Sequence, residues 1–126
     1  AQILGCLLGV MLANVFFEHN ILELSTKNRD GFHIFLSEII ATFGLIFIIF
    51  ATLKDGKITI AASVATYIMA GYWFTSSTSF ANPAVAIART FTDSFTGINY
   101  MNTPTYILAE FLGALIAVFL IKKLIK

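Results

Sequence analysis

Four long apolar stretches alternate with short polar segments along this chain of 126 residues. Each stretch approaches the roughly 20 apolar residues that an α-helix needs to cross a hydrocarbon core about 30 Å thick. The pattern therefore predicts an all-α protein whose helices lie in a membrane. The predicted spans are residues 1–17, 34–53, 58–74 and 105–121.

The composition also favours a membrane protein. Hydrophobic residues make up 58% of the chain and charged residues 12%, whereas soluble domains carry roughly 25% charged residues. A net charge of +1 gives no reason to expect nucleic acid as a partner. The polar residues assemble neither a nucleophile–base pair nor a metal-ligand cluster, so we expect no enzymatic activity, no metal and no cofactor. Cys6 lies in an apolar stretch and is expected to pack, while His19 and His33 are expected to be solvated.

The first apolar stretch does not read as a signal peptide. It has no initiating methionine, no basic leader and no cleavage site before polar sequence. We therefore expect a partial chain that opens inside a membrane helix, with its upstream part missing.

The placement of lysines predicts how the spans are oriented. Cytoplasmic loops of membrane proteins are rich in lysine and arginine. If the turn at 54–57 and the C-terminus are both cytoplasmic, the spans alternate in direction, and the 18–33 connection lies outside. The lysines that support this orientation are Lys54, Lys57, Lys122, Lys123 and Lys126.

A short internal repeat joins the first and last spans. AQILGCLLGV at residue 1 aligns with AEFLGALIAV at residue 109, with Ala, Leu, Gly, Leu and Val identical. Two apolar helices could share these letters through biased composition alone. The predicted directions are opposite, however, and similar helices in opposite orientations are typical of an inverted-topology repeat. In the first copy, Gly5 and Gly9 form a G-x-x-x-G pattern that predicts close helix packing.

The polar segment between the third and fourth spans carries the candidate chemistry. It reads TSSTSFANPAVAIARTFTDSFTG from Thr75 to Gly97. Asn82 followed by Pro83 is a favourable helix start, because Asn suits the N-cap and Pro the first helical position. A helix from Pro83 to about Asp93 would be about 16 Å long, roughly half of a bilayer core. Such a helix cannot span, and we expect it to be re-entrant, with the hydroxyl-rich stretch beside a water-filled path.

An asparagine at this cap gives the predicted half-helix a specific capability. The side-chain oxygen of Asn82 can accept from the free N–H groups of the helix, which leaves its NH₂ group as an outward donor. A helix N-terminus carries about half a positive charge. A neutral hydroxyl solute would meet a donor there, while cations would be repelled. The pattern indicates conduction of neutral solutes without ion leakage.

With its context, the motif F-A-N-P-A-V resembles the second signature of the major intrinsic proteins, the aquaporins and aquaglyceroporins. The stretch S-E-I-I-A-T-F-G at 37–44, the repeat and the lysine pattern match this family as well. The resemblance implies an aquaporin-like inverted-repeat helical bundle with a re-entrant half-helix. Residues 1–126 would be the C-terminal portion of one channel domain, from the end of span 3 through span 6, with the second pore half-helix at about 83–93. It also implies a homotetramer with one pore per subunit.

The resemblance assigns roles to particular residues. Asn82 would be one of two pore asparagines, and Glu38 would be the family's buried glutamate that holds the pore loop. An ionisable group inside a membrane is costly, which independently favours a functional or structural role for Glu38. The remaining pore positions would be Pro83 and Ala84 in the motif, and the carbonyl groups of Thr78, Ser79 and Phe80 as a ladder of acceptors.

The chain departs from the family at the outer filter. Val85 stands where the family usually has arginine after Asn-Pro-Ala, and the other filter positions are small, Ala70 and Ser79. We therefore expect a wider filter that passes glycerol-sized polyols or neutral metalloid hydroxides, as proposed for a bacterial subgroup with valine there. Arg89, one turn beyond Val85, could guard the outer mouth, or could form an i,i+4 salt bridge with Asp93.

The leading hypothesis is thus a passive channel for small uncharged solutes, in the lipid bilayer of a bacterial inner membrane. A secondary transporter is the alternative, because such transporters share broken helices and inverted repeats. Coupled transport usually needs ionisable groups in the membrane, and here only Glu38 and Glu110 qualify. Glu110 could instead satisfy a neighbouring helix or extend its carboxylate outward. A non-conducting packing protein is a third possibility.

Overall fold

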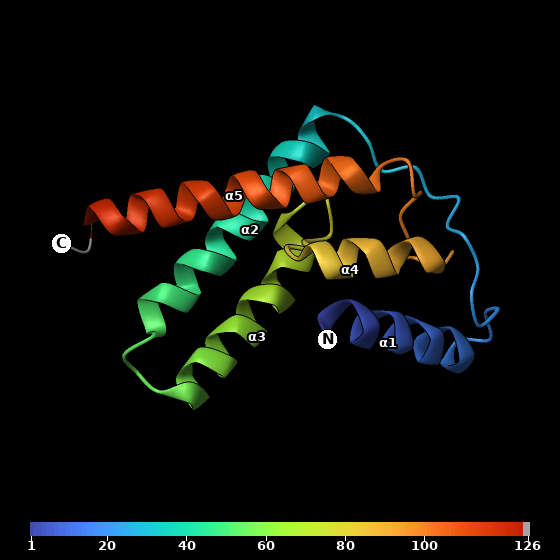
Figure 1. The fold of residues 1–126 in the computed structure, drawn as a ribbon, viewed down its shortest axis with the longest axis horizontal. Coiled ribbons are helices and arrows are strands. Elements are labelled where there is room, and N and C mark those ends of the chain that lie inside the picture. The colour runs from blue at the N-terminus through green and yellow to red at the C-terminus, as the bar shows by residue number, and fades with distance from the viewer. Residues whose placement is uncertain (125–126) are drawn as a thin grey trace.

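The computed structural model describes residues 1–124, which are helical with no strand in that range (Figure 1). The all-α class predicted from the sequence is therefore confirmed. The helices α2 and α5 are long and apolar enough to cross a membrane on those criteria alone, whereas α1 is shorter. The elements are α1 (Gln2–Phe16), α2 (Phe32–Thr52), α3 (Lys57–Phe74), α4 (Pro83–Ala88), the short 3₁₀ helix η1 (Arg89–Phe91) and α5 (Thr103–Leu124).

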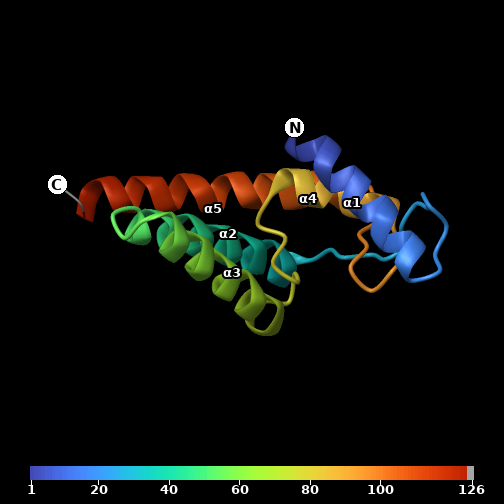
Figure 2. The same cartoon turned by 90° about the horizontal axis from the view of Figure 1, so that it is seen from below.

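Helices α2 and α5 form the central pair, and α3 packs against α2 (Figures 1 and 2). Gly113 of α5 makes the close approach possible. A methyl group added there would collide with the carbonyl oxygen of Ile39 and crowd Thr42 on α2. Ala117, one turn further along α5, is fully buried. Small residues on α5 thus bring the two helices together, as is usual for helix packing in lipid.

The two copies of the repeat lie in different surroundings. Helix α1 packs against α4 and η1, and it runs in the opposite direction to α5 (Figure 1). A methyl group added at Gly5 or Gly9 would meet no atom within 4 Å, so the close packing predicted there is not made within residues 1–124. The equivalent glycine in the second copy, Gly113, does make it, because α2 lies beside α5.

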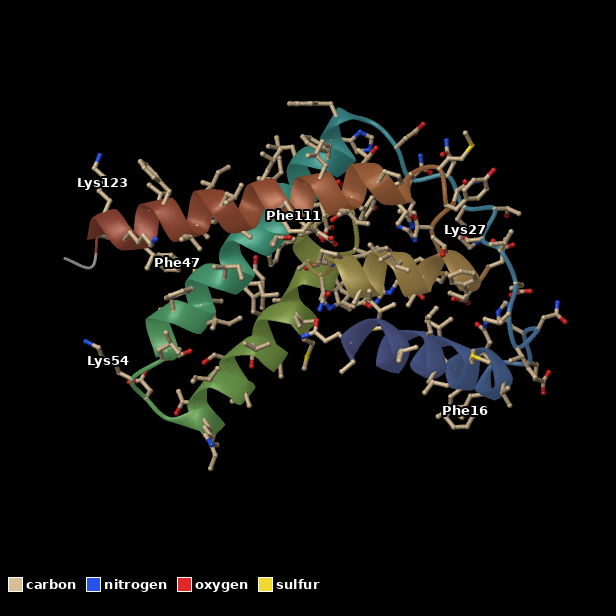
Figure 3. The ribbon with its side chains drawn as sticks, in the orientation of Figure 1. Phe16, Lys27, Phe47, Lys54, Phe111 and Lys123 are labelled. Carbon is tan, nitrogen blue, oxygen red and sulfur yellow. The ribbon has the colours of Figure 1, made fainter. Side chains whose placement is uncertain are left out.

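The lysine-rich regions lie together at one end of the molecule. Lys54 and Lys123 are at the left of Figure 3, and Lys27 in the opposite connection is at the right. The turn before α3 ends on Gly56, whose φ of 90° favours glycine. The shared end agrees with the alternation predicted from the lysines, whose membrane orientation stays a prediction. Lys126 lies outside the described residues.

Large apolar side chains cover the outside of the bundle. Trp73 is 88% exposed, and Phe111 is 58% exposed. Such a surface suits contact with lipid or with other membrane helices rather than water. The connection between α1 and α2 is extended instead of helical, and it runs along η1 and the segment after it. The Ser25 N–H donates to the Thr90 carbonyl at 2.9 Å, and Arg29 Nε donates to the Gly97 carbonyl at 2.9 Å.

Candidate pore segment

The chain between α3 and α4 adopts an unusual backbone. Thr78, Ser79 and Ala81 have positive φ values of 66°, 51° and 50°, which non-glycine residues adopt rarely and at an energetic cost. The segment is also buried, with Ser77 fully inaccessible. A costly conformation in a buried place requires strong partners for its backbone polar groups.

Glu38 of α2 is one such partner. Its carboxylate, which is fully buried, accepts from the Phe80 N–H at 3.3 Å and from the Ala81 N–H. The sequence alone predicts a functional or structural role for Glu38, because an ionisable group inside a membrane helix is costly. The structure places it directly beneath two consecutive N–H groups of the segment.

Glu110 of α5 is the second partner, which the sequence reasoning did not assign to the site. Its Oε1 accepts from the Asn82 N–H at 3.0 Å, and only 1% of the residue is exposed. The carboxylate therefore does not extend outward. The signal that could have found it was already visible, since Glu110 is ionisable, lies within a predicted span and aligns with Gln2 in the repeat.

Tyr106, one turn before Glu110, adds a third attachment to α5. Its hydroxyl donates to the Ser77 carbonyl at 3.2 Å, and its ring packs on the Phe80 ring with centroids 4.8 Å apart. The segment is therefore held by α2 and α5 together, and its position depends on how closely those two helices pack.

Asn82 caps α4 as its residue type predicted. It has extended backbone angles, and its Oδ1 accepts from the Ala84 N–H at 2.9 Å, with Pro83 at the first helical position. Its side-chain NH₂ group donates to no residue among 1–124. The helical run ends at Phe91 in η1 rather than at about Asp93, because Thr92 is extended and the Asp93 carboxylate is engaged elsewhere, as described below.

The three carbonyl groups predicted as an acceptor ladder are free of internal partners. The carbonyl oxygens of Thr78, Ser79 and Phe80 accept no hydrogen bond from residues 1–124. The side-chain hydroxyls of Thr78 and Ser79 are buried and also lack a partner within that range. Buried acceptors without partners are costly unless water or a solute reaches them.

The three small filter positions are only partly brought together. Ser79 packs against Gly71 at the end of α3, where an added methyl group would lie 2.5 Å from Ser79 Oγ. Ala70, the neighbour of Gly71, is exposed on α3. Val85 is half-buried on the first turn of α4. Ser79 thus packs against Gly71 on α3, the residue next to Ala70, while Val85 lines a cavity that neither Ser79 nor Ala70 lines.

Arg89 is held by aromatic residues. Its Nη2 donates to the Tyr72 hydroxyl, and its guanidinium carbon lies 4.4 Å from the centroid of the Phe80 ring. Within residues 1–124 it forms no ion pair with Asp93, so the salt-bridge alternative is wrong. The geometry instead places a cation over the aromatic ring of a loop residue, a favourable arrangement.

Asp93 is bound by the connection between α1 and α2. Its Oδ1 accepts from the Thr26 N–H at 2.8 Å and from the Thr26 hydroxyl at 3.0 Å. The backbone N–H of Thr26 is the main reason that the pKa of the Asp93 carboxyl lies below its ordinary value. These contacts explain why the carboxylate does not turn back toward Arg89.

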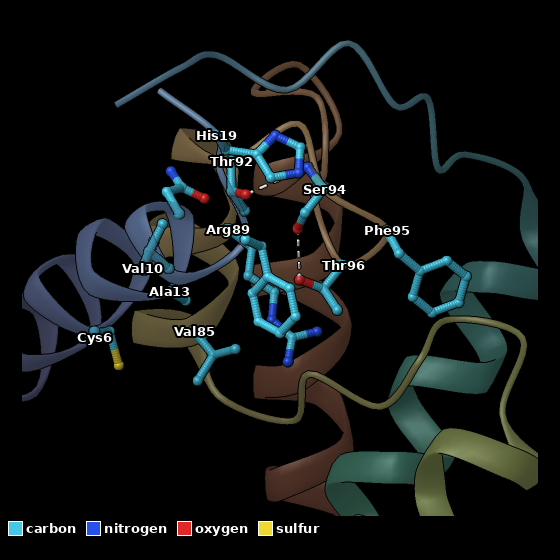
Figure 4. A pocket seen from close by; sticks show the side chains of 14 residues that line it. Cys6, Val10, Ala13, His19, Val85, Arg89, Thr92, Ser94, Phe95 and Thr96 are labelled. Atoms are coloured by element: carbon cyan, nitrogen blue, oxygen red, sulfur yellow. Dashed lines mark hydrogen bonds between the residues drawn. The ribbon is translucent and has the colours of Figure 1, made fainter. Parts of the chain in front are cut away.

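A cavity of about 520 Å³ opens between α1, α4 and the segment 92–96 (Figure 4). Val85 and Arg89 line it together, so the two residues one turn apart on the helical run share one space. Cys6 and His19 line the same cavity. His19 is half-buried and pairs with Glu23 at 2.7 Å, so it is not simply solvated as expected.

Comparison with known proteins places this geometry in a family. A sequence model for the major intrinsic proteins matches residues 1–120. The chain belongs to the major intrinsic protein family. Its membership confirms an integral membrane protein and confirms the expectation that the chain is not an enzyme.

A curated member of this family is similar to the whole chain. Aquaglyceroporin AqpS of Rhizobium meliloti (strain 1021) is 44% identical over all 126 residues, which cover 54% of that protein. The chain thus spans about half the length of this relative. No solved structure shows a significant match to the chain.

Proposed function

We propose that residues 1–126 are the C-terminal portion of a passive channel for small uncharged solutes. In this proposal they supply the end of span 3, spans 4 to 6 and the second pore half-helix. The solutes are water, glycerol-sized polyols and neutral metalloid hydroxides. The similar relative is named an aquaglyceroporin, which supports solutes of glycerol size.

The hydrogen bonding of Asn82 is the observation that carries the proposal. The side-chain oxygen is used to cap α4, while the NH₂ group has no partner among the described residues. Beside it lie three carbonyl groups with no internal donor, on Thr78, Ser79 and Phe80. A donor next to a row of acceptors matches the hydrogen-bonding needs of a hydroxyl solute that moves past them.

Small residues set the width of the proposed pore. Val85, Ser79 and Ala70 carry no bulky or charged group at the filter positions. A narrow filter with arginine would reject polyols, whereas these side chains leave room for the carbon backbone of glycerol. Their small size therefore favours a solute channel over a strict water pore.

Arg89 supplies the positive charge that Val85 lacks. It lines the same cavity as Val85 and is held over Phe80, a residue of the acceptor ladder. We assign it to the outer mouth, where a fixed guanidinium would repel cations without narrowing the filter.

The assembly and location are further parts of the proposal. Large exposed apolar residues on α3 and α5, such as Trp73 and Phe111, are compatible with contacts between subunits of a homotetramer as well as with lipid. The organism of the relative supports a bacterial inner membrane.

Flux measurements on the full-length protein in proteoliposomes test the proposal. Stopped-flow light scattering should show water and glycerol permeation well above that of protein-free vesicles, with glycerol flux linear in concentration. Boric acid serves as the probe for metalloid hydroxides. Saturation at low glycerol concentration, or dependence on a proton or sodium gradient, would favour the secondary transporter. The absence of any permeation would favour a packing protein.

A further inference from the structure

We propose that Glu110 is a positioning residue for the pore asparagine, acting through one carboxylate oxygen on the backbone of Asn82. The inference rests on the proposed function, because the orientation of Asn82 matters for transport only if Asn82 faces the solute. It assigns α5 a direct part in setting solute selectivity.

Three consecutive backbone N–H groups carry the argument. Glu38 on α2 takes the groups of Phe80 and Ala81, and Glu110 on α5 takes that of Asn82 at 3.0 Å. The two carboxylates therefore have different tasks. Glu38 binds the two residues that precede Asn82, whereas Glu110 binds Asn82 itself, whose side chain is proposed to contact the solute.

The N–H of Asn82 determines where the Asn82 side chain points. As N-cap, Asn82 has φ −158° and ψ 119°, so its N–H lies outside the helical hydrogen-bond pattern and needs a separate acceptor. Oδ1 of the same residue is fixed by the Ala84 N–H at 2.9 Å. With the backbone fixed by Glu110 and the oxygen by Ala84, the side-chain NH₂ group has one direction left.

Only one oxygen of Glu110 takes part. Oε2 is buried and has no hydrogen-bond partner within residues 1–124. The repeat places Gln2 at the equivalent position, and glutamine has one acceptor oxygen and no charge. Both observations indicate that the acceptor is required and the charge is not. A residue that only filled space between the helices would need no acceptor oxygen at this position.

The test uses three substitutions in the full-length channel in proteoliposomes. Glu110→Gln keeps an acceptor and removes the charge. Glu110→Asp keeps the charge and withdraws the oxygens by one methylene. Glu110→Met keeps the length and removes the strong acceptor. Glu18→Gln and Glu18→Met, at an exposed position beyond α1, are the matched controls.

The ratio of glycerol to water permeability is the readout that separates positioning from folding. A variant with fewer folded channels lowers both permeabilities equally and leaves the ratio unchanged. A displaced Asn82 donor should lower glycerol permeation by about tenfold, the order expected for loss of one neutral hydrogen bond to the solute, and water permeation less. We expect a lower ratio for Glu110→Asp and Glu110→Met, and the wild-type ratio for Glu110→Gln and the controls.

The outcomes distinguish this inference from the proposed function. A wild-type protein that conducts nothing contradicts the channel itself. A conducting wild type whose ratio is unchanged by Glu110→Asp overturns the positioning role, and this holds even where Glu110→Met does not fold. Equal losses for Glu110→Gln and Glu110→Asp would show that charge and length matter instead of the acceptor, which also overturns the inference.

Discussion

The inner and outer ends of the half-helix are held in contrasting ways. At the inner end, before α4, three N–H groups are bound by carboxylates that are 0% and 1% exposed, on Glu38 and Glu110. At the outer end, after η1, the chain is bound by the connection between α1 and α2. Several of those contacts, such as the one from Thr26 to Asp93, are exposed.

The difference lies in what replaces a lost hydrogen bond. Water can take the place of a partner at the outer end, so each contact there contributes little. Water is not expected to replace the Glu38 carboxylate as the acceptor for the buried N–H groups of the segment. An unsatisfied buried N–H costs about 1–3 kcal/mol. The inner end should therefore be sensitive to single substitutions, and the outer end tolerant of them.

The largest effect is expected for Glu38→Leu. The change leaves the buried N–H groups of Phe80 and Ala81 without an acceptor, at a cost of about 1–3 kcal/mol each. That loss is comparable to the stability margin of many proteins. We expect little folded protein after purification, as measured by size-exclusion chromatography, and no permeability in what remains.

Glu38→Gln is the control for this prediction. It retains one acceptor oxygen and should recover part of the yield. If Glu38→Leu keeps wild-type yield and permeability, the inner end is not more sensitive to substitution than the outer end, and the prediction is wrong.

An intermediate effect is expected for Val85→Arg, on the first turn of α4. A guanidinium there would narrow the filter and add a second positive charge near Arg89. We expect glycerol permeability to fall by about tenfold or more while water permeability is largely retained, since a filter barrier higher by about 1.4 kcal/mol gives that factor. Stopped-flow measurement of both solutes checks this. An unchanged ratio of glycerol to water permeability would show that Val85 is not a filter residue.

Arg89→Gln in the same vesicles separates the two positions. The variant keeps a polar side chain near Tyr72 and loses the cation over Phe80. Polyol selectivity should change little, whereas exclusion of small cations, followed with a sodium-sensitive dye, should weaken. Unchanged cation exclusion would count against Arg89 as the outer guard.

The smallest effect is expected at Asp93. The Thr26 N–H holds the pKa of this carboxyl below its ordinary value, so the ionised form is favoured in the folded protein. The resulting stabilisation is fully present at neutral pH and is lost as the pH falls through the lowered folded pKa. We expect Asp93→Asn to melt slightly below wild type at pH 7, and to lose less stability than wild type on acidification below about pH 4. A large loss of stability at pH 7 would show that the outer end is not tolerant.

Much of the pore segment could be predicted from the residues themselves. Asn82, Pro83 and the hydroxyl run before them indicated a capped half-helix, because capping preference and proline geometry are local properties. The helices followed from hydropathy, and the predicted ranges differ from α2, α3 and α5 by only a few residues at each end. Of these three helices, α2 and α5 are long and apolar enough to cross a membrane, and the span predicted at α3 stays a prediction. The end of the half-helix was predicted too far along the chain, since Asp93 is held by Thr26, which is distant in sequence.

Contacts between distant residues were decided only by the tertiary structure. The aromatic partners of Arg89 were not visible from the residues, which suggested the outer mouth or a salt bridge with Asp93. The residues also left open whether Glu110 satisfies a neighbouring helix or extends outward. The left-handed backbone at Thr78, Ser79 and Ala81 was not visible either, because non-glycine residues adopt it only when surrounding groups enforce it. Local preferences are properties of short stretches, and they determined the half-helix and the spans. Which carboxylate binds which N–H depends on how closely α2 and α5 approach at Gly113, and that is a property of the packed helices.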